Sequence, residues 1–287
     1  MVLRKVLAVV AAGAAIALLV PAGAAEAASR TSVVASFYPI AWAAQQVGGD
    51  RVTVTNLTPA GAEPHDLELN PDQIDRVLDA GVVLELGHGF QPAVEQAAEQ
   101  RDGPTVELLP AGTKDPHIWL DPVRMATIVR TTQRALTKVD PEGRATYARN
   151  AQRVLNDLTG LDARYRTGLA HCQRDVIVTA HEAFGHLAAR YGLRQEGVAG
   201  LSPDAEPDAQ RIGQLTDLVK HDGITTVFTE ELVSPRIADT LAREAGVKTS
   251  TLNPLEGLTD RELAKHEDYV TVMDQNLTKL RAALACS

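Results

Sequence analysis

Short apolar runs alternate with amphipathic stretches along most of the chain. Apolar runs rich in Val, Ile and Thr predict β-strands, whereas apolar residues spaced three and four apart predict helices. In the first half, strands are predicted at Val33–Phe37, Val52–Leu57, Val82–Leu86 and Thr105–Leu108, with helices at Ile40–Val47, Pro71–Leu78 and Pro92–Glu99. Strand and helix in turn indicate βαβ units and a largely parallel sheet.

The second half repeats this rhythm. Strands are predicted at Val176–Thr179, Leu193–Val198, Ile224–Thr229 and Val247–Leu252, and helices at Phe184–Tyr191, Asp208–Lys220, Pro235–Ala245 and Asp268–Leu284. The repeated pattern predicts a second α/β lobe.

Between the halves, from Pro122 to His171, only helical pattern is present. Asp140 suits an N-cap and Pro141 a first helical turn, so Glu142–Ala170 predicts one helix of about 28 residues, roughly 42 Å long. The predicted fold class is α/β, with two α/β lobes of mainly parallel sheets joined by one long rigid helix. The predicted divisions are an N-terminal lobe at 28–140, the linking helix at 141–171 and a C-terminal lobe at 172–287. A stiff linker argues against large closure of the lobes.

The first residues carry an export pattern. Arg4 and Lys5 precede an apolar run from Val6 to Val20, and small residues lead to Ala27. This order predicts a secretory signal peptide at residues 1–27. The alternative, a membrane anchor, is disfavoured because a spanning helix needs about 20 apolar residues. We therefore expect an exported chain, periplasmic or extracellular.

Charge and cysteine content narrow the function further. The chain has a net charge of −9 and no basic run, which argues against nucleic acid and anionic membranes as partners. Its two cysteines, Cys172 and Cys286, predict a disulfide in an oxidising compartment. The alternative, a pair of metal-binding thiolates, lacks nearby ligand spacing. Because neither cysteine lies at the expected cleavage point, we expect that the protein is not a lipoprotein.

Three histidines occupy equivalent places. His65 and His181 follow predicted strands, and His117 precedes a predicted helix, so each lies at a strand-to-helix connection. Ligands of open α/β sheets gather at the carboxyl ends of strands. A single loop histidine is usually an ordinary polar residue. For three histidines at equivalent positions, a shared metal site is as plausible as three ordinary polar residues. Imidazoles suit zinc, and one oxygen ligand would complete a tetrahedron.

Five short motifs resemble the zinc-specific solute-binding proteins of metal ABC transporters. They are Pro64-His65-Asp66, His117–Pro122, His181–Gly185, Gly200–Pro203 with Glu206-Pro207, and Leu252–Gly257. The resemblance implies that Glu256 is the fourth metal ligand. It also implies high-affinity capture of one Zn²⁺ and its delivery to the membrane permease of an ABC transporter by a monomer without enzymatic activity. The family's manganese carriers tend to have a carboxylate where His181 stands, which favours Zn²⁺ over Mn²⁺. The long histidine-rich insert of many zinc carriers is missing between His65 and His117.

Two other functions compete with this interpretation. A zinc enzyme would use three histidines and an open water position, with Glu256 as general base. A surface adhesin is the other, supported only by the shared fold. His186 is expected not to bind metal, because it is five residues from His181 and the two would not share a helix face. His88, at another strand end, is also expected not to bind metal. Glu63, Asp66 and Glu182 flank the histidines, and any of them could orient an imidazole.

Overall fold

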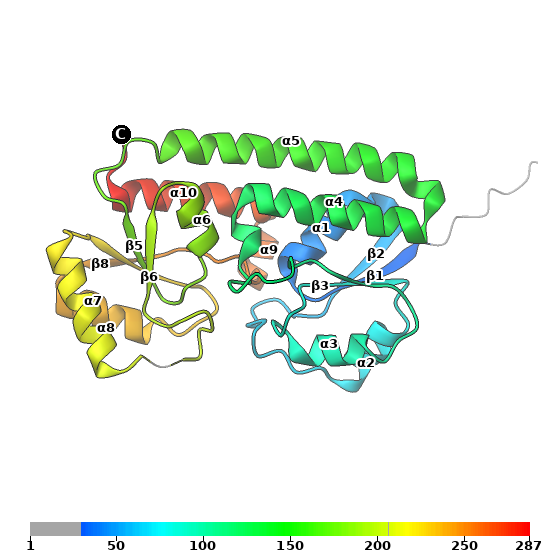
Figure 1. Ribbon diagram of the computed structural model, residues 1–287, viewed down its shortest axis with the longest axis horizontal. Helices are drawn as coiled ribbons and strands as arrows, with labels where there is room; N and C mark the ends of the chain where they lie inside the picture. The colour runs from blue at the N-terminus through cyan, green and yellow to red at the C-terminus, as the bar shows by residue number, and fades with distance from the viewer. Residues whose placement is uncertain (1–29, 206) are drawn as a thin grey trace, which may run out of the picture.

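The computed structural model describes residues 30–205 and 207–287. The predicted signal peptide at 1–27, and Glu206 of the fourth motif, lie outside the described residues. Two α/β lobes lie side by side beneath a layer of long helices that crosses both of them (Figure 1). Among the described residues, no helix combines the length and apolar character needed to cross a bilayer.

The first lobe is built on a four-stranded parallel sheet. Its strands are β1 (Thr31–Ala35), β2 (Val52–Asn56), β3 (Val82–Glu85) and β4 (Thr105–Glu107), in the order β2-β1-β3-β4. Alternate residues of β1 face opposite layers, as strand geometry requires. Val33 packs in the core beneath α1 (Tyr38–Gly48), and Val34 packs with α2 (Pro71–Leu78) and α3 (Pro92–Ala98).

The second lobe repeats this plan. Its strands are β5 (Val176–Thr179), β6 (Arg194–Gly197), β7 (Thr226–Thr229) and β8 (Lys248–Thr251), all parallel in the order β6-β5-β7-β8. Its helices are α6 (Gly185–Arg190), α7 (Ala209–His221), α8 (Arg236–Ala245), α9 (Asp260–Ala264) and α10 (Tyr269–Leu284). The short helix α9 was not predicted, because five residues are too few to show a helical period.

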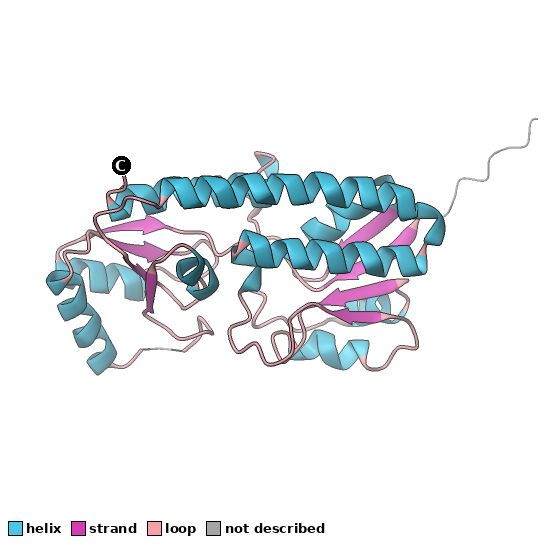
Figure 2. Ribbon diagram, turned by 45° about the horizontal axis from the view of Figure 1, so that its top comes forward, coloured by secondary structure: helices cyan, strands magenta, loops and turns pink. Residues whose placement is uncertain are grey.

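Helix α4 (Pro122–Val139) lies over the first lobe, and α5 (Arg144–Gly168) runs along both lobes (Figure 2). The linking helix α5 has 25 residues and is shorter than predicted, because Pro141–Gly143 form a separate 3₁₀ turn. That turn is capped by Asp140, whose side chain accepts a hydrogen bond from the Gly143 N–H. The division of the chain at residues 140 and 171 stays a prediction.

One hydrophobic core extends through both lobes. It includes Val33 of β1, Leu158 of α5, Phe184 beside α6 and Leu280 of α10. Two buried tyrosines tie the C-terminal helix to this core. The Tyr269 hydroxyl donates to the Trp119 carbonyl at 2.6 Å, and the Tyr165 hydroxyl donates to the Met273 carbonyl at 2.7 Å. The fold class predicted from the sequence is therefore confirmed.

A disulfide joins Cys172, just beyond α5, to Cys286 at the end of the chain, 114 residues away. It fixes the C-terminus against the end of the linking helix.

Candidate metal centre

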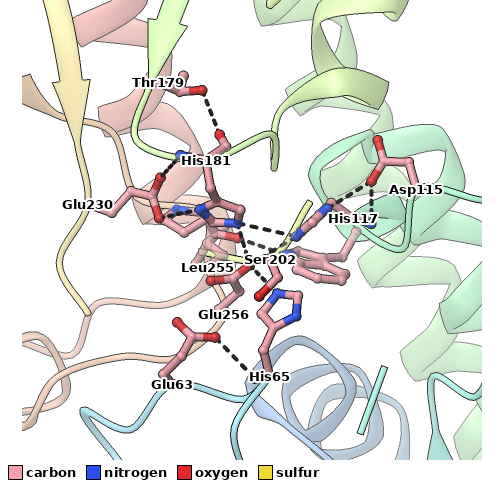
Figure 3. Close-up of polar contacts among 12 residues, drawn as sticks. Glu63, His65, Asp115, His117, Thr179, His181, Ser202, Glu230, Leu255 and Glu256 are labelled. Carbon is pink, nitrogen blue, oxygen red and sulfur yellow. Dashed lines mark hydrogen bonds and ion pairs between the residues drawn. The ribbon is translucent and has the colours of Figure 1, made fainter. Parts of the chain in front are cut away.

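Four side chains from both lobes meet between the two sheets (Figure 3). His65 lies in the loop after β2, His117 immediately precedes the turn that leads into α4, His181 follows β5, and Glu256 lies in the loop after β8. Three of these segments leave the carboxyl ends of parallel strands, where α/β folds place their ligands. The structure thus brings together all four residues named from the sequence.

Four of the six distances between their donor atoms match those of a tetrahedral metal site. The Glu256 Oε1 atom lies 3.4 Å from Nε2 of His65 and 3.2 Å from Nε2 of both His117 and His181. The Nε2 atoms of His117 and His181 are 3.4 Å apart. Ligands at about 2.0–2.1 Å from a tetrahedral ion are separated by about 3.3–3.4 Å. All four donor atoms lie within 4.8 Å of one another, so one ion at the centre would bind them after a small adjustment of the side chains.

The centre is shielded from solvent. The side chains of His117, His181 and Glu256 are fully buried, and that of His65 is 11 % exposed. Burial alone would raise the pKa of Glu256, but hydrogen bonds from the three imidazoles hold that pKa well below its usual value. A buried carboxylate without such partners would be strongly unfavourable. Its second oxygen, Oε2, has no partner among the described residues.

Two further carboxylates orient the imidazoles. The Nδ1 of His181 lies 2.7 Å from Glu230 Oε2, and the backbone N–H of His181 donates to Glu230 Oε1 at 3.1 Å. Asp115 Oδ1 lies 2.8 Å from Nδ1 of His117 and accepts a bond from the His117 backbone N–H. With the proton on Nδ1, the Nε2 lone pair of each ring is free to bind a metal.

These carboxylates also change the pKa of the rings. Burial would lower the pKa of His181, but hydrogen bonds and charge from Glu230 and Glu256 outweigh it and raise that pKa to about 11. The pKa of His117 is likewise raised, because Asp115 and Glu256 outweigh its burial. Protons therefore compete with a metal ion for this centre.

The loop that carries Glu256 is held by a buried amide network. The Leu255 N–H donates to Asn253 Oδ1 at 2.7 Å, and Asn276 of α10 donates to the Asn253 carbonyl at 2.7 Å. Leu255 has a φ of +57°, a left-handed conformation that is uncommon for a side chain of this kind. This network fixes the strained residue directly before Glu256.

Sequence reasoning missed Glu230 and left Asp115 without a role. Glu230 directly follows β7, so its place at a strand end was the signal that could have found it. Of the three carboxylates suggested, Glu63 accepts a bond from the His65 backbone N–H at 3.1 Å. Within the described part of the chain, neither Asp66 nor Glu182 bonds to a ring of the centre. The His186 ring donates to the Asp115 carbonyl at 2.9 Å, and His88 lies 3.6 Å from Glu107.

The fold and this centre define a class: two-lobed α/β proteins with one closed, four-donor metal-binding centre between the lobes. Within that class the chain belongs to the family described as zinc-uptake complex component A, periplasmic (ZnuA), which matches residues 33–283.

Named relatives agree with this placement. The chain is 35 % identical over 277 residues to the zinc-binding lipoprotein AdcA of Streptococcus pneumoniae, covering 88 % of this chain and 55 % of AdcA. It is 33 % identical over 280 residues to the high-affinity zinc uptake system protein ZnuA of Bacillus subtilis, covering 89 % and 88 %. The chain thus spans about half the length of AdcA and most of that ZnuA.

Solved structures share the fold. The Zn(II)-bound ZnuA-like domain of S. pneumoniae AdcA is 36 % identical with a TM-score of 0.78, covering 89 % of this chain and 99 % of that domain. The laminin-binding protein Lmb of Streptococcus agalactiae, described as bifunctional with adhesin and metal transporting activity, is 28 % identical. Its TM-score is 0.82, with coverage of 88 % of this chain and 99 % of Lmb.

The expectation that the protein is not a lipoprotein is wrong. Two S. pneumoniae relatives are named zinc-binding lipoproteins, which points to attachment at a membrane. The expectation rested on the position of the cysteines relative to a cleavage point that lies outside the described residues.

Proposed function

We propose that this protein captures one Zn²⁺ ion outside the cytoplasm and delivers it to the permease of an ABC transporter for zinc uptake. The observation that carries the proposal is the convergence of one donor atom each from His65, His117, His181 and Glu256, all within 4.8 Å of one another. We assign these four residues as the ligands of the transported ion. The named zinc-uptake relatives support the assignment, and we propose that the protein acts as a monomer.

The donor set favours Zn²⁺ over Mn²⁺. Three imidazole nitrogens and one carboxylate oxygen suit a borderline ion, whereas Mn²⁺ prefers more oxygen ligands and binds more weakly to any given set. Only the His65 side chain of the centre is exposed, at 11 %, which disfavours the several bound waters of a larger coordination sphere.

We further propose that the centre does not catalyse a reaction. A catalytic zinc site usually has three protein ligands and an open position for water. Here Glu256 lies at hydrogen-bond distance from all three imidazoles, so the fourth position already belongs to the protein. The carboxylate of a general base would instead be separated from the metal position by a water molecule.

The decisive experiment is competition between Zn²⁺ and Mn²⁺ on metal-free protein, followed by calorimetry with a competing chelator. We expect one Zn²⁺ per chain and preference for Zn²⁺. His117→Ala and Glu256→Ala should both weaken Zn²⁺ binding, the first by more, while His221→Ala, an exposed position on α7, serves as the matched control.

A stoichiometry near zero would contradict the proposal. If Glu256→Ala left the affinity for Zn²⁺ unchanged but removed a hydrolytic activity, the enzyme hypothesis would replace it.

A further inference from the structure

A cavity of about 410 Å³ lies where α1 and β2 of the first lobe meet the segment that follows Glu256. Its walls are largely apolar and include Trp42, Val54, Leu258 and Leu263. The side chain of Leu263 is one of few large apolar groups exposed among the described residues, at 44 %. A volume of this size suits a small organic molecule. None of the four proposed zinc ligands lines this cavity.

The charged groups that line the cavity are all negative. Glu267 and Asp268 line it, and no lysine, arginine or histidine does. Among the described residues, neither carboxylate forms an ion pair with a basic side chain. The rings of Tyr38 and Trp42 add aromatic walls, which attract cations. The charge of this cavity is therefore complementary to a cation.

Trp42, which lines the cavity, carries a buried hydrogen-bond donor without a partner among the described residues. Its ring stacks on Tyr269 at 4.8 Å, and Trp42 is only 8 % exposed. The indole N–H has no acceptor among the described residues. Such a buried, unpaired donor is unfavourable, and an acceptor group on a bound molecule would relieve it after a small adjustment. By contrast, the indole N–H of Trp119 donates to the Pro254 carbonyl at 2.8 Å.

We propose that this cavity binds a small organic cation with an apolar body, and that its occupancy strengthens zinc capture. The second part rests on the proposed function. The cavity is lined by Pro59 and Ala60, in the loop that leads to His65, and by Gly257 and Leu258, directly after Glu256. The Gly61 N–H donates to the Leu258 carbonyl at 3.0 Å and ties these two segments together.

The sign of the coupling follows from the structure. The conformation that contains the formed cavity is also the one in which the four zinc ligands are assembled. A molecule that binds this conformation preferentially must favour the assembled centre, and zinc must favour the cavity by the same factor.

The binding test uses ¹⁵N-labelled, metal-free protein and tyramine as the probe. The chain has only two tryptophans, so two indole N–H signals report on the cavity and on a buried reference. We expect tyramine to shift the Trp42 signal saturably and more than that of Trp119, with Trp42→Phe providing the assignment. The neutral analogue 4-ethylphenol should bind about three- to fivefold more weakly, and 3-(4-hydroxyphenyl)propionate should not bind.

Charge is tested by a matched pair of variants. Glu267→Gln should weaken tyramine binding about threefold without changing the affinity for 4-ethylphenol. Glu244→Gln, an exposed position on α8 away from the cavity, should change neither affinity. No saturable shift, or equal affinities for tyramine and 4-ethylphenol in the unmodified protein, would overturn the cation site.

The coupling test measures zinc affinity with and without saturating tyramine. We expect tyramine to strengthen zinc binding by about threefold or more, and zinc to strengthen tyramine binding by the same factor. Zinc affinity that stays constant at full occupancy would overturn the coupling. Absence of zinc binding without tyramine would contradict the proposed function alone, because the indole shift is measured on metal-free protein.

Discussion

At the scale of single residues, the centre depends on carboxylates that do not bind the metal. Glu230 holds both the ring and the backbone of His181, and Asp115 does the same for His117. Each accepts a hydrogen bond from Nδ1 and so points Nε2 of its ring toward the position between the four ligands. Substitution of either carboxylate should therefore lower the affinity for metal more than it lowers the free energy of unfolding.

Glu230→Gln should weaken zinc binding by about 10- to 100-fold, because the acceptor of the His181 Nδ1–H loses its charge. Calorimetry with a competing chelator measures this change. Glu231→Gln alters the neighbouring carboxylate, which has no contact with the four ligands, and is the control. Equal affinities of the two variants would show that Glu230 does not orient the ligand.

Zinc affinity should rise with pH through the neutral range. The pKa of His181, raised to about 11, means that its ring holds an additional proton at pH 7 in metal-free protein, and the raised pKa of His117 favours proton binding in the same direction. Binding must release protons, and each proton released changes the affinity about tenfold per pH unit. Calorimetry in buffers of different ionisation enthalpy counts them. Zero release at pH 7 would mean that the rings are already neutral.

Most ligands could be predicted from single residues, but their supports could not. His65, His117 and His181 lie at segment ends that are visible in the hydrophobic pattern. Glu256 lies in a loop that looks like any exposed carboxylate, so only family resemblance identified it. Glu230 is 49 residues from His181, and their contact is created by the pairing of β5 with β7. The strand end marks Glu230 as a residue near the centre, but its contact with His181 depends on strand pairing and has no local sequence signal.

At the scale of elements, the junction of α4 and α5 is fixed by one side chain. Asp140 accepts hydrogen bonds from Arg51 at 2.7 and 2.9 Å and from the Tyr147 hydroxyl, and also caps the turn before α5. The strand and helix pattern predicted the order of these elements well. It misplaced the start of α5, because Glu142 and Gly143 fit a helix or a 3₁₀ turn equally and the Asp140 cap decides between them.

Acid should remove the contribution of this junction to stability. The Arg51 hydrogen bond outweighs desolvation and lowers the pKa of Asp140 to about 2. Because the folded pKa is below the unfolded value of about 3.9, the contribution is complete above pH 4 and is lost as pH falls toward 2.

Asp140→Asn should therefore lower the melting temperature at pH 7 by about 2–4 °C and lower it much less near pH 2, as measured by circular dichroism. Asp157→Asn on the exposed side of α5 is the control. An equal decrease in melting temperature at both pH values would show that Asp140 acts through its cap hydrogen bond alone and not through its charge.

At the scale of the whole molecule, the disulfide closes a segment of 114 residues that includes the entire second sheet. Cys172→Ser with Cys286→Ser should lower the free energy of unfolding by about 4–5 kcal/mol if restriction of the unfolded chain dominates. Urea unfolding of the oxidised protein, the reduced protein and the double variant measures this. Equal free energies of unfolding for the reduced protein and the double variant would show that the loss comes from the missing cross-link and not from the substituted side chains. Stability equal to that of the oxidised protein would contradict the entropic account.

The hydrophobic cluster shared by the two lobes also determines how cooperatively the molecule unfolds. Each lobe also has a smaller buried cluster of its own, but Leu158 and Leu280 pack in the same large cluster as the first sheet, so unfolding of either lobe exposes part of the core of the other. Thermal unfolding should then be a single cooperative transition, and zinc should move that transition as a whole. Two separate steps, with only one responding to zinc, would show independent lobes. Mutations far from the zinc ligands, anywhere in this cluster, would thus lower the fraction of protein able to hold the ion.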